Sequence, residues 1–155
     1  MKTAVFLLSL LAAAPGFSAS MLSVSAEQVN VRSGPGADFD VVWRAARYYP
    51  LEILDSSGKW LMVSDYANEE GWVSRSVLSY VPAVVVVTQK ANVREGPGLE
   101  YGISWVLEKE FSLKVLDVSG AWYKVTDGEE VEGWVHKSVA WGFTGRAELE
   151  GRGQY

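Results

Sequence analysis

The chain of 155 residues contains no cysteine and a single histidine. Without cysteine it can have no disulfide, no thiol nucleophile and no lipid-modified N-terminal cysteine. The lone histidine, His136, gives a histidine-based metal site too few ligands, and a Ser/His/Asp triad would have to be built around this one residue. These absences predict a protein that is not an enzyme and that carries no metal or other cofactor. An enzyme that depends on His136 is the alternative that they leave open.

Basic residues are also few. Lysine and arginine total 14 against 19 acidic residues, which leaves a net charge of −5 at pH 7. A protein that binds nucleic acid needs a basic face, and here the basic residues are scattered among carboxylates. We therefore expect no nucleic acid among the partners. The content of 48% hydrophobic and 21% charged residues is typical of a globular protein.

An apolar run near the N-terminus, from Ala4 to Ala14, is interrupted only by a serine. It follows one lysine, is too short to span a bilayer and precedes proline, glycine and small residues, which is typical of a secretory signal peptide. Cleavage near residue 20 is favoured over cleavage after Ala26, because the later cut would remove the first strand of the fold. We therefore expect a signal peptide over 1–20, no membrane span after its cleavage, and a periplasmic or secreted protein. An uncleaved anchor is the alternative.

The rest of the sequence is organised around a duplication. Asn-Val-Arg-x-Gly-Pro-Gly occurs over 30–36 and again over 92–98, an offset of 62 residues from Asn30 to Asn92. Such an internal repeat predicts two copies of one folding unit. We place the units at 21–81 and 82–144. The segment after Trp141 is rich in glycine and charge and predicts a flexible C-terminal tail, assigned to 145–155. The same offset relates Trp43 to Trp105, Gly58 to Gly120, Trp60 to Trp122, and Gly71-Trp72-Val73 to Gly133-Trp134-Val135.

Each copy shows short strands between turn residues and no extended helical periodicity. Five short strands would expose the edges of a sheet unless it curled, so the predicted fold class is all-β, with a small barrel in each copy. The run Val84 to Val87 is apolar on both faces, which predicts that one face packs against the other domain. The strands are expected over 22–31, 41–44, 51–56, 60–64 and 71–74, and over 84–93, 103–107, 113–118, 122–126 and 133–136.

Three motifs recur in both copies: Asn-Val-Arg-x-Gly-Pro-Gly, then Gly-x-Trp, then Gly-Trp-Val with a serine three residues on. In this order and spacing they resemble the bacterial Src-homology-3 (SH3b) family over roughly residues 22–142. The resemblance implies two tandem small SH3-like β-barrels in an exported protein, acting as a targeting module for peptidoglycan or its peptides. Such modules are often attached to cell-wall hydrolases. We see no hydrolase domain beside the repeats, which argues against an activity inherited from those enzymes.

Several motif residues are interpreted as structural. Arg32 and Arg94 are expected to form internal ion pairs rather than to bind a ligand carboxylate, because possible partners recur with them: Asp55 and Asp117, or Asp65 and Asp127. The acidic hairpins before each Gly-Trp-Val are expected to be solvated turns, since they lack the oxygen spacing of a calcium loop. His136 is expected at the surface, at a strand end. Core packing is the expected role of Trp60, Trp72, Trp122 and Trp134.

The candidate ligand-binding residues are aromatic. Trp43 and Trp105 flank the loop region of each copy, where a half-exposed ring would stack on a sugar or a peptide. The other candidates differ between the copies and surround the same region. The sequence does not separate a shallow binding site from a contact between the domains. The full set is Phe39, Trp43, Tyr48, Tyr49, Tyr101, Trp105 and Phe111.

The function predicted from the sequence is therefore that of a non-enzymatic exported binding module. Its expected partner is cell-wall peptidoglycan, peptides derived from it, or an envelope protein. The alternative is a structural or assembly protein that pairs with another envelope protein or with itself, for which the exposed edge strands of a small barrel are suited.

Overall fold

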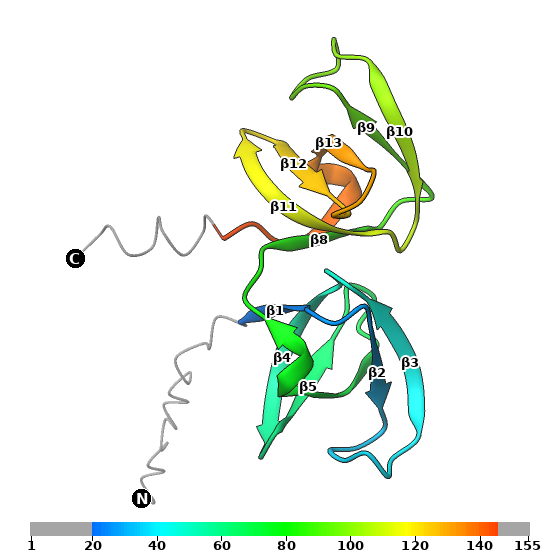
Figure 1. Ribbon diagram of the computed structural model, residues 1–155, viewed down its shortest axis with the longest axis vertical. Helices are drawn as coiled ribbons and strands as arrows, with labels where there is room; N and C mark the ends of the chain where they lie inside the picture. The colour runs from blue at the N-terminus through cyan, green and yellow to red at the C-terminus, as the bar shows by residue number, and fades with distance from the viewer. Residues whose placement is uncertain (1–19, 146–155) are drawn as a thin grey trace, which may run out of the picture.

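The computed structural model describes residues 20–145, which form two all-β domains stacked one above the other (Figure 1). The predicted signal peptide, apart from Ser20, and the predicted tail beyond Gly145 lie outside the described residues. Over 20–145 there is no helix of the length and hydrophobicity that crossing a bilayer requires. Each domain contains one seven-stranded antiparallel sheet and one short 3-10 helix.

In the first domain the strand order is β3-β2-β6-β5-β4-β1-β7. The sheet bends strongly around a single core (Figure 1). Its elements are β1 (Met21–Val24), β2 (Gln28–Arg32), β3 (Val41–Ala46), β4 (Pro50–Ser57), β5 (Trp60–Ser64), β6 (Glu70–Ser74), the 3-10 helix η1 (Arg75–Val77) and β7 (Leu78–Ser79).

The second domain repeats this order as β10-β9-β13-β12-β11-β8-β14. The prediction of an all-β protein with two tandem small SH3-like barrels is therefore confirmed. The elements are β8 (Ala83–Val86), β9 (Lys90–Arg94), β10 (Ile103–Glu108), β11 (Ser112–Ser119), β12 (Trp122–Thr126), β13 (Glu132–His136), the 3-10 helix η2 (Lys137–Val139) and β14 (Ala140–Phe143).

The first strand predicted in each copy is in fact two strands. The predicted strand 22–31 is divided into β1 and β2, and the predicted strand 84–93 is divided into β8 and β9. The two halves pair with different neighbours: β1 with β4, and β2 with β3. The chain must bend between the halves because they lie on different parts of the curled sheet, and the apolar pattern does not show this bend.

Each domain also ends in a 3-10 helix and a strand that the sequence pattern did not predict. The strand β14 includes Gly142 and Phe143, which composition alone groups with the tail. Gly142 has φ +153°, and a Cβ at this position would lie 2.1 Å from the carbonyl oxygen of Ala83. This glycine therefore permits a close strand pairing rather than a loose end.

Both cores consist mainly of valine and leucine. Trp60, Trp72, Trp122 and Trp134 are half-buried and belong to neither core, so the prediction that they pack in the core was wrong. Strand alternation explains their position. In β5, Leu61 and Val63 are buried, whereas Trp60 and Met62 point to the opposite face of the sheet.

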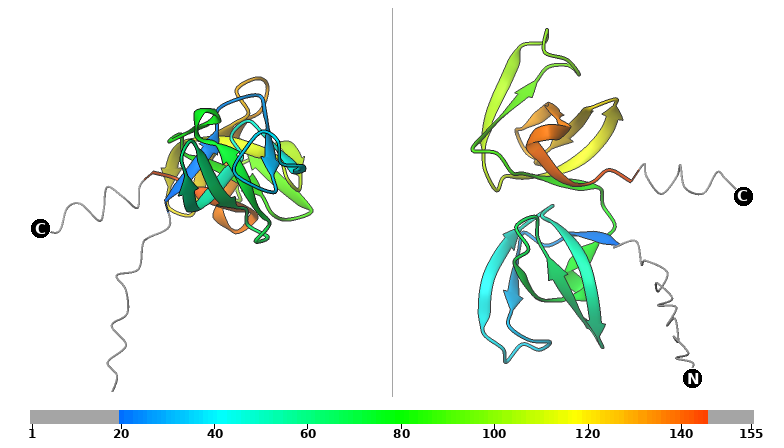
Figure 2. Two further views of the ribbon diagram at one scale, coloured as in Figure 1. Left: turned by 90° about the horizontal axis from the view of Figure 1, so that it is seen from below. Right: turned by 180° about the vertical axis from the view of Figure 1, so that it is seen from behind.

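The strand β8 contributes to both domains. All its residues are buried: Val84 and Val86 lie in the second core, while Val85 lies in the first. Figure 2, seen from behind, shows β8 at the level where the domains meet. The prediction that the valine run packs one face against the other domain is confirmed. The domains are consequently joined through shared core residues.

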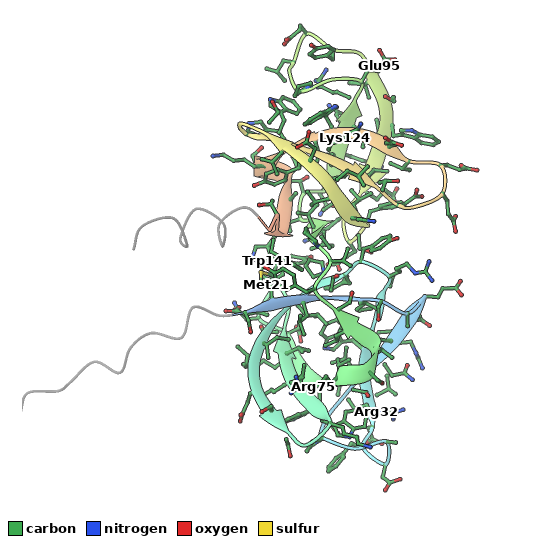
Figure 3. The ribbon with its side chains drawn as sticks, turned by 60° about the vertical axis from the view of Figure 1, so that its left-hand side comes forward. Met21, Arg32, Arg75, Glu95, Lys124 and Trp141 are labelled. Atoms are coloured by element: carbon green, nitrogen blue, oxygen red, sulfur yellow. The ribbon has the colours of Figure 1, made fainter. Side chains whose placement is uncertain are left out.

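Trp141 extends this contact from the other end of the second sheet. It packs against the first core, and its ring centroid lies 6.4 Å from that of Tyr66. Figure 3 shows Trp141 at the level where the two domains meet. The last strand of the second domain thus helps to cover the first.

A polar cluster completes the junction. Glu110 of the second domain accepts hydrogen bonds from the hydroxyls of Tyr49, at 3.0 Å, and of Tyr66. The hydroxyl of Ser112 donates to the carbonyl of Arg47 at 2.6 Å. Burial raises the pKa of Tyr49 above the usual range of tyrosine, with the charges of Glu110 and Asp65 adding to the effect. We call Tyr49, Tyr66 and Glu110 the tyrosine–glutamate joint.

Candidate functional site

The seven aromatic residues predicted as ligand-binding lie in different places. Phe39 and Tyr101 lie over the glycine-proline loops, on Gly34 and Gly96. A Cβ on either glycine would come within 2.4 Å of the ring above it. The rings are 47% and 43% exposed, so each covers its loop with one face and meets solvent with the other.

Trp43 and Tyr49 lie in a groove at the junction of the domains. Their ring centroids are 5.9 Å apart with an edge-on arrangement, and Trp43 packs against the first core. The groove has a volume of about 390 Å³, and its lining also includes Asp65, Glu69 and Glu110. Tyr49 is therefore part of a domain contact.

Tyr48 and Phe111 line a second groove at the junction, of about 290 Å³. Trp105 lies apart from all of these, on the strand β10, and is 38% exposed. The structure therefore does not bring the seven predicted residues together. All seven were predicted because they lie near one long loop in the sequence. In the structure they lie on the glycine-proline loops, at the junction of the domains and on the edge strand β10.

A larger cleft lies in the second domain, with a volume of about 650 Å³. One wall comes from alternate residues of β9, which project to one face of the strand. The rest of the lining comes from β12, β13, η2 and the glycine-proline loop. The lining residues are Lys90, Asn92, Arg94, Gly98, Leu99, Glu100, Trp122, His136, Ser138 and Val139.

Arg94 holds the loop in place beside this cleft. Its Nη1 donates to the carbonyl oxygens of Leu99, at 3.3 Å, and Tyr101, at 2.9 Å. Arg32 makes the equivalent bond to the carbonyl of Phe39 at 2.9 Å. Both arginines make internal bonds, as expected, but the predicted aspartate partners were wrong. Over residues 20–145 these Nη1 groups bind backbone carbonyls rather than aspartates.

The predicted aspartate partners organise turns instead. Asp65 Oδ1 accepts hydrogen bonds from the backbone N–H groups of Ala67 and Glu69, each at 2.9 Å. Asp127 does the same for Glu129 and Val131 in the second copy. These are local turns in which a short side chain satisfies the backbone. The acidic hairpins are thus stabilised by their own backbone.

An aromatic corner is part of the lining of the cleft. The rings of Trp122 and His136 meet edge to face, with centroids 5.1 Å apart. His136 Nδ1 accepts the backbone N–H of Ser138 at 3.2 Å and lies 2.7 Å from its hydroxyl, an arrangement that caps the start of η2. The imidazole is therefore fixed in orientation beside the indole.

The sequence reasoning missed this corner because it assigned Trp122 to the core and His136 to the open surface. The signal was present in the alternation of β12 and β13. Trp122 is directly opposite His136 in the strand pairing, and the buried residues of these strands are Val125, Gly133 and Val135. Residues on the face opposite the core therefore meet across the strands.

The chemistry of the cleft is that of a binding site. Lys90 and Arg94 supply cationic donors, Asn92 an amide, and Trp122 an aromatic surface. Lys90 is held 3.1 Å from Glu108 by an exposed ion pair, which costs little to exchange for a ligand contact. Among the described residues there is no group of three or more histidine or acidic side chains placed to hold a metal ion.

Comparison with curated proteins gives a relative that matches most of the described part of the chain. The chain is 24% identical over 123 residues to the "Putative N-acetylmuramoyl-L-alanine amidase YrvJ" of Bacillus subtilis. The match covers 72% of this chain but only 24% of that protein, so the chain spans about a quarter of its length.

Among solved structures, the fold is similar to two proteins titled as NlpC proteins. NlpC1 from Trichomonas vaginalis matches with a TM-score of 0.38 and 16% identity, over 86% of this chain and 50% of the other. An NlpC/P60 family protein from Bacillus cereus matches with a TM-score of 0.38 and 15% identity, over 79% and 56%. Similarity at this level adds nothing to the assignment of the family.

The family is assigned from separate matches to the two halves of the chain. Models of the bacterial SH3 domain match residues 27–79 and residues 87–142, which together make up more than half of the sequence. The matched ranges span most of each seven-stranded sheet, from β2 to β7 and from β9 to β14. The chain belongs to the bacterial SH3 domain family and contains two such domains in tandem.

Proposed function

We propose that this protein is an exported, non-enzymatic module that binds cell-wall peptidoglycan or its peptides, and that the cleft of the second domain is its binding site. The observation that carries the proposal is the combination of an aromatic corner, Trp122 with His136, and cationic donors in one cleft of about 650 Å³. Peptidoglycan offers matching chemistry, since it consists of sugar rings and short peptides with free carboxylates.

Each part of the cleft has a role in this proposal. The face of Trp122 stacks on a sugar ring or an apolar peptide side chain, and His136 holds that ring at its edge. Lys90 and the remaining donors of Arg94 receive a carboxylate. Leu99 and Glu100 lie at the loop that borders the site. Such a shallow, mixed site suits a flexible polymer better than it suits a buried small molecule.

The family and the relative support this assignment. Bacterial SH3 domains are expected, from the resemblance given above, in proteins that act at the cell wall. The B. subtilis relative is named for action on an N-acetylmuramoyl-L-alanine bond, and the similarity is confined to about a quarter of it. A region that is shared with a wall enzyme but makes up so little of it suits a targeting role. The same reasoning favours a location outside the cytoplasm.

Binding to purified peptidoglycan sacculi tests the proposal. Residues 21–155 are incubated with washed sacculi, and the retained fraction is compared for wild type, Trp122→Ala and Trp60→Ala. Trp60 occupies the equivalent position of the first domain and is also half-buried, so the two variants lose the same side chain in similar settings. We expect retention of wild type and Trp60→Ala, and at least about a tenfold loss for Trp122→Ala, the amount that about 1.4 kcal/mol of stacking supplies.

Two other outcomes would change this conclusion. If Trp122→Ala and Trp60→Ala lose retention equally while circular dichroism shows that both are folded, both domains bind peptidoglycan and not the cleft of the second domain alone. Wild type left in the supernatant would remove peptidoglycan as the partner. That result would favour the alternative, an assembly protein that pairs with another envelope protein.

A further inference from the structure

The loop and edge strand of the second domain expose an unusual amount of apolar surface. Leu99, Tyr101, Ile103, Trp105 and Val106 are 76%, 43%, 49%, 38% and 55% exposed. They lie on the loop that enters β10 and on β10 itself, the outermost strand of its sheet. Within residues 20–145 β10 pairs only with β9. Figure 1 shows β10 on the outer side of the second domain, where another chain can reach it.

The equivalent edge of the first domain is protected. Val106 corresponds to Arg44, whose Nε donates to Asn30 at 3.1 Å. Trp105 corresponds to Trp43, which packs against Tyr49 and the first core. A charged side chain in an edge strand is a common means of preventing strand pairing between molecules. The second copy has lost this protection, since residues 101–107 contain no charge.

We propose that β10 is a self-association surface, which pairs antiparallel with β10 of a second copy of this chain across a two-fold axis. The occupant must supply an extended strand with no charge along its centre, and residues 103–107 of β10 in a second copy supply one. With the axis at Trp105, Ile103 lies opposite Leu107, and Ser104 lies opposite Val106. Glu108 then lies opposite Gly102, so no like charges face each other.

This pairing extends the sheet of each second domain into a continuous sheet across the two molecules. It covers the exposed rings of Trp105 and the side chains of Val106, which otherwise meet water. It also fixes two tandem molecules to one another. If each carries a binding site, a polymeric ligand is held at two points at once.

Sedimentation velocity over protein concentrations from about 1 to about 300 µM tests the proposal, because weak interfaces dissociate in this range. The key variant is Val106→Arg, which restores the residue type of the first copy. The control is Leu54→Arg, since Leu54 is also an exposed apolar residue, at 45%, but lies on β4 of the first domain. We expect a concentration-dependent dimer for wild type and Leu54→Arg, and at least about a tenfold weaker dimer for Val106→Arg.

Two results would overturn the proposal. If the wild type stays monomeric over the whole range, β10 does not pair with itself, and its partner would have to be a strand of another protein. A Val106→Arg variant that associates as wild type does would move the contact away from β10.

The absence of cysteine allows the register to be tested directly. In an antiparallel pair, directly opposed residues have Cα atoms about 4.5 to 5.5 Å apart, which is within disulfide range. Trp105→Cys is therefore expected to form a disulfide-linked dimer on mild oxidation. Ser104→Cys and Val106→Cys are expected to cross-link with each other more than either does with itself. If Trp105→Cys gives no more dimer than the control Leu54→Cys, the proposed pairing is wrong.

Discussion

The two domains carry the same motifs at the same offset but use one region differently. Both sheets have the same order, and both have an irregularity at the same place, between Ile53 and Asp55 and between Val115 and Asp117. The difference lies in the hairpin from the third strand to the fourth. In the first domain Trp43 packs on Tyr49, whereas in the second Trp105 is exposed. The same tryptophan therefore has different surroundings in the two copies, because the residues around it differ, as Tyr49 differs from Phe111.

The turn of this hairpin also has the same backbone in both domains but different contacts. Tyr48 and Glu110 occupy equivalent positions and both have positive φ, +66° and +77°, which is uncommon for residues with a side chain. The fold thus requires the same backbone in both copies. Tyr48 lies against Gly128 of the other domain, whereas Glu110 accepts the bonds of the joint. One strained turn in each domain is used to hold the other domain.

The largest effects should come from the leucines that the copies share. Leu51 and Leu113 are equivalent and fully buried, so Leu51→Ala and Leu113→Ala should each cost about 3 to 5 kcal/mol in the free energy of unfolding. Because Val85 lies in the first core while its strand belongs to the second sheet, we expect one cooperative transition by calorimetry. Both variants should lower the melting temperature of the whole molecule.

Leu54→Ala and Leu116→Ala are the matched controls for these variants. Both leucines are exposed, at 45% and 44%, and each should change stability by only about 0.5 kcal/mol. Two separate transitions, with only one shifted in each core variant, would mean that the domains unfold independently in spite of the shared strand.

The next largest effect on the free energy of unfolding should distinguish Trp43 from Trp105, which occupy equivalent positions in the repeat. Trp43→Ala should cost about 2 to 3 kcal/mol, because it removes a half-buried ring from the first core and from its contact with Tyr49. Trp105→Ala should cost less than about 1 kcal/mol in dilute solution, since the ring is 38% exposed. Chemical denaturation at low protein concentration measures both. Equal costs would contradict the difference between the two hairpins.

The sequence was sufficient for the fold because the fold depends on residues with narrow roles. The glycine-proline loops, the Gly-Trp-Val strands and the valine run each permit few alternatives, and the repeat supplies every one of them twice. The bends that divide the first strand of each copy were not predictable. They depend on which strands pair at a distance, and the local apolar pattern is the same on both sides of the bend.

The candidate site was predicted less well, for a different physical reason. Trp122 and His136 are 14 positions apart in the sequence and meet only because β12 and β13 pair in one register. A tryptophan in a small barrel is expected inside, and here the core is filled by valine and leucine, which leaves the larger rings on the outer face. Tyr49 and Glu110 likewise meet only because the domains dock. Alternation along β12 and β13 shows on which face Trp122 and His136 lie, but neither contact follows from local sequence without the strand pairing or the docking of the domains.

The smallest predicted effect concerns the tyrosine–glutamate joint, and it appears only in alkali. Burial raises the pKa of Tyr66 from 10.0 to about 12, with its hydrogen bond to Glu110 and the charge of Glu110 adding to the effect. The folded protein therefore holds this proton after the unfolded chain has released it. Stability from the joint is complete below pH 10 and is lost as the pH rises from about 10 towards 12. Tyr49 changes stability in the same direction, since its pKa is also raised.

Absorbance of tyrosinate against pH, together with denaturation midpoints at each pH, measures this loss. Tyr66 should ionise at higher pH than tyrosines with the ordinary pKa of 10.0, so we expect Tyr66→Phe to remove the absorbance change near pH 12. The same variant should lose less stability than wild type as the pH rises above 10. Tyr123→Phe is the control, because Tyr123 lies in the second domain and packs against the second core rather than in the joint. If both variants flatten the profile equally, the alkaline loss does not arise at the joint.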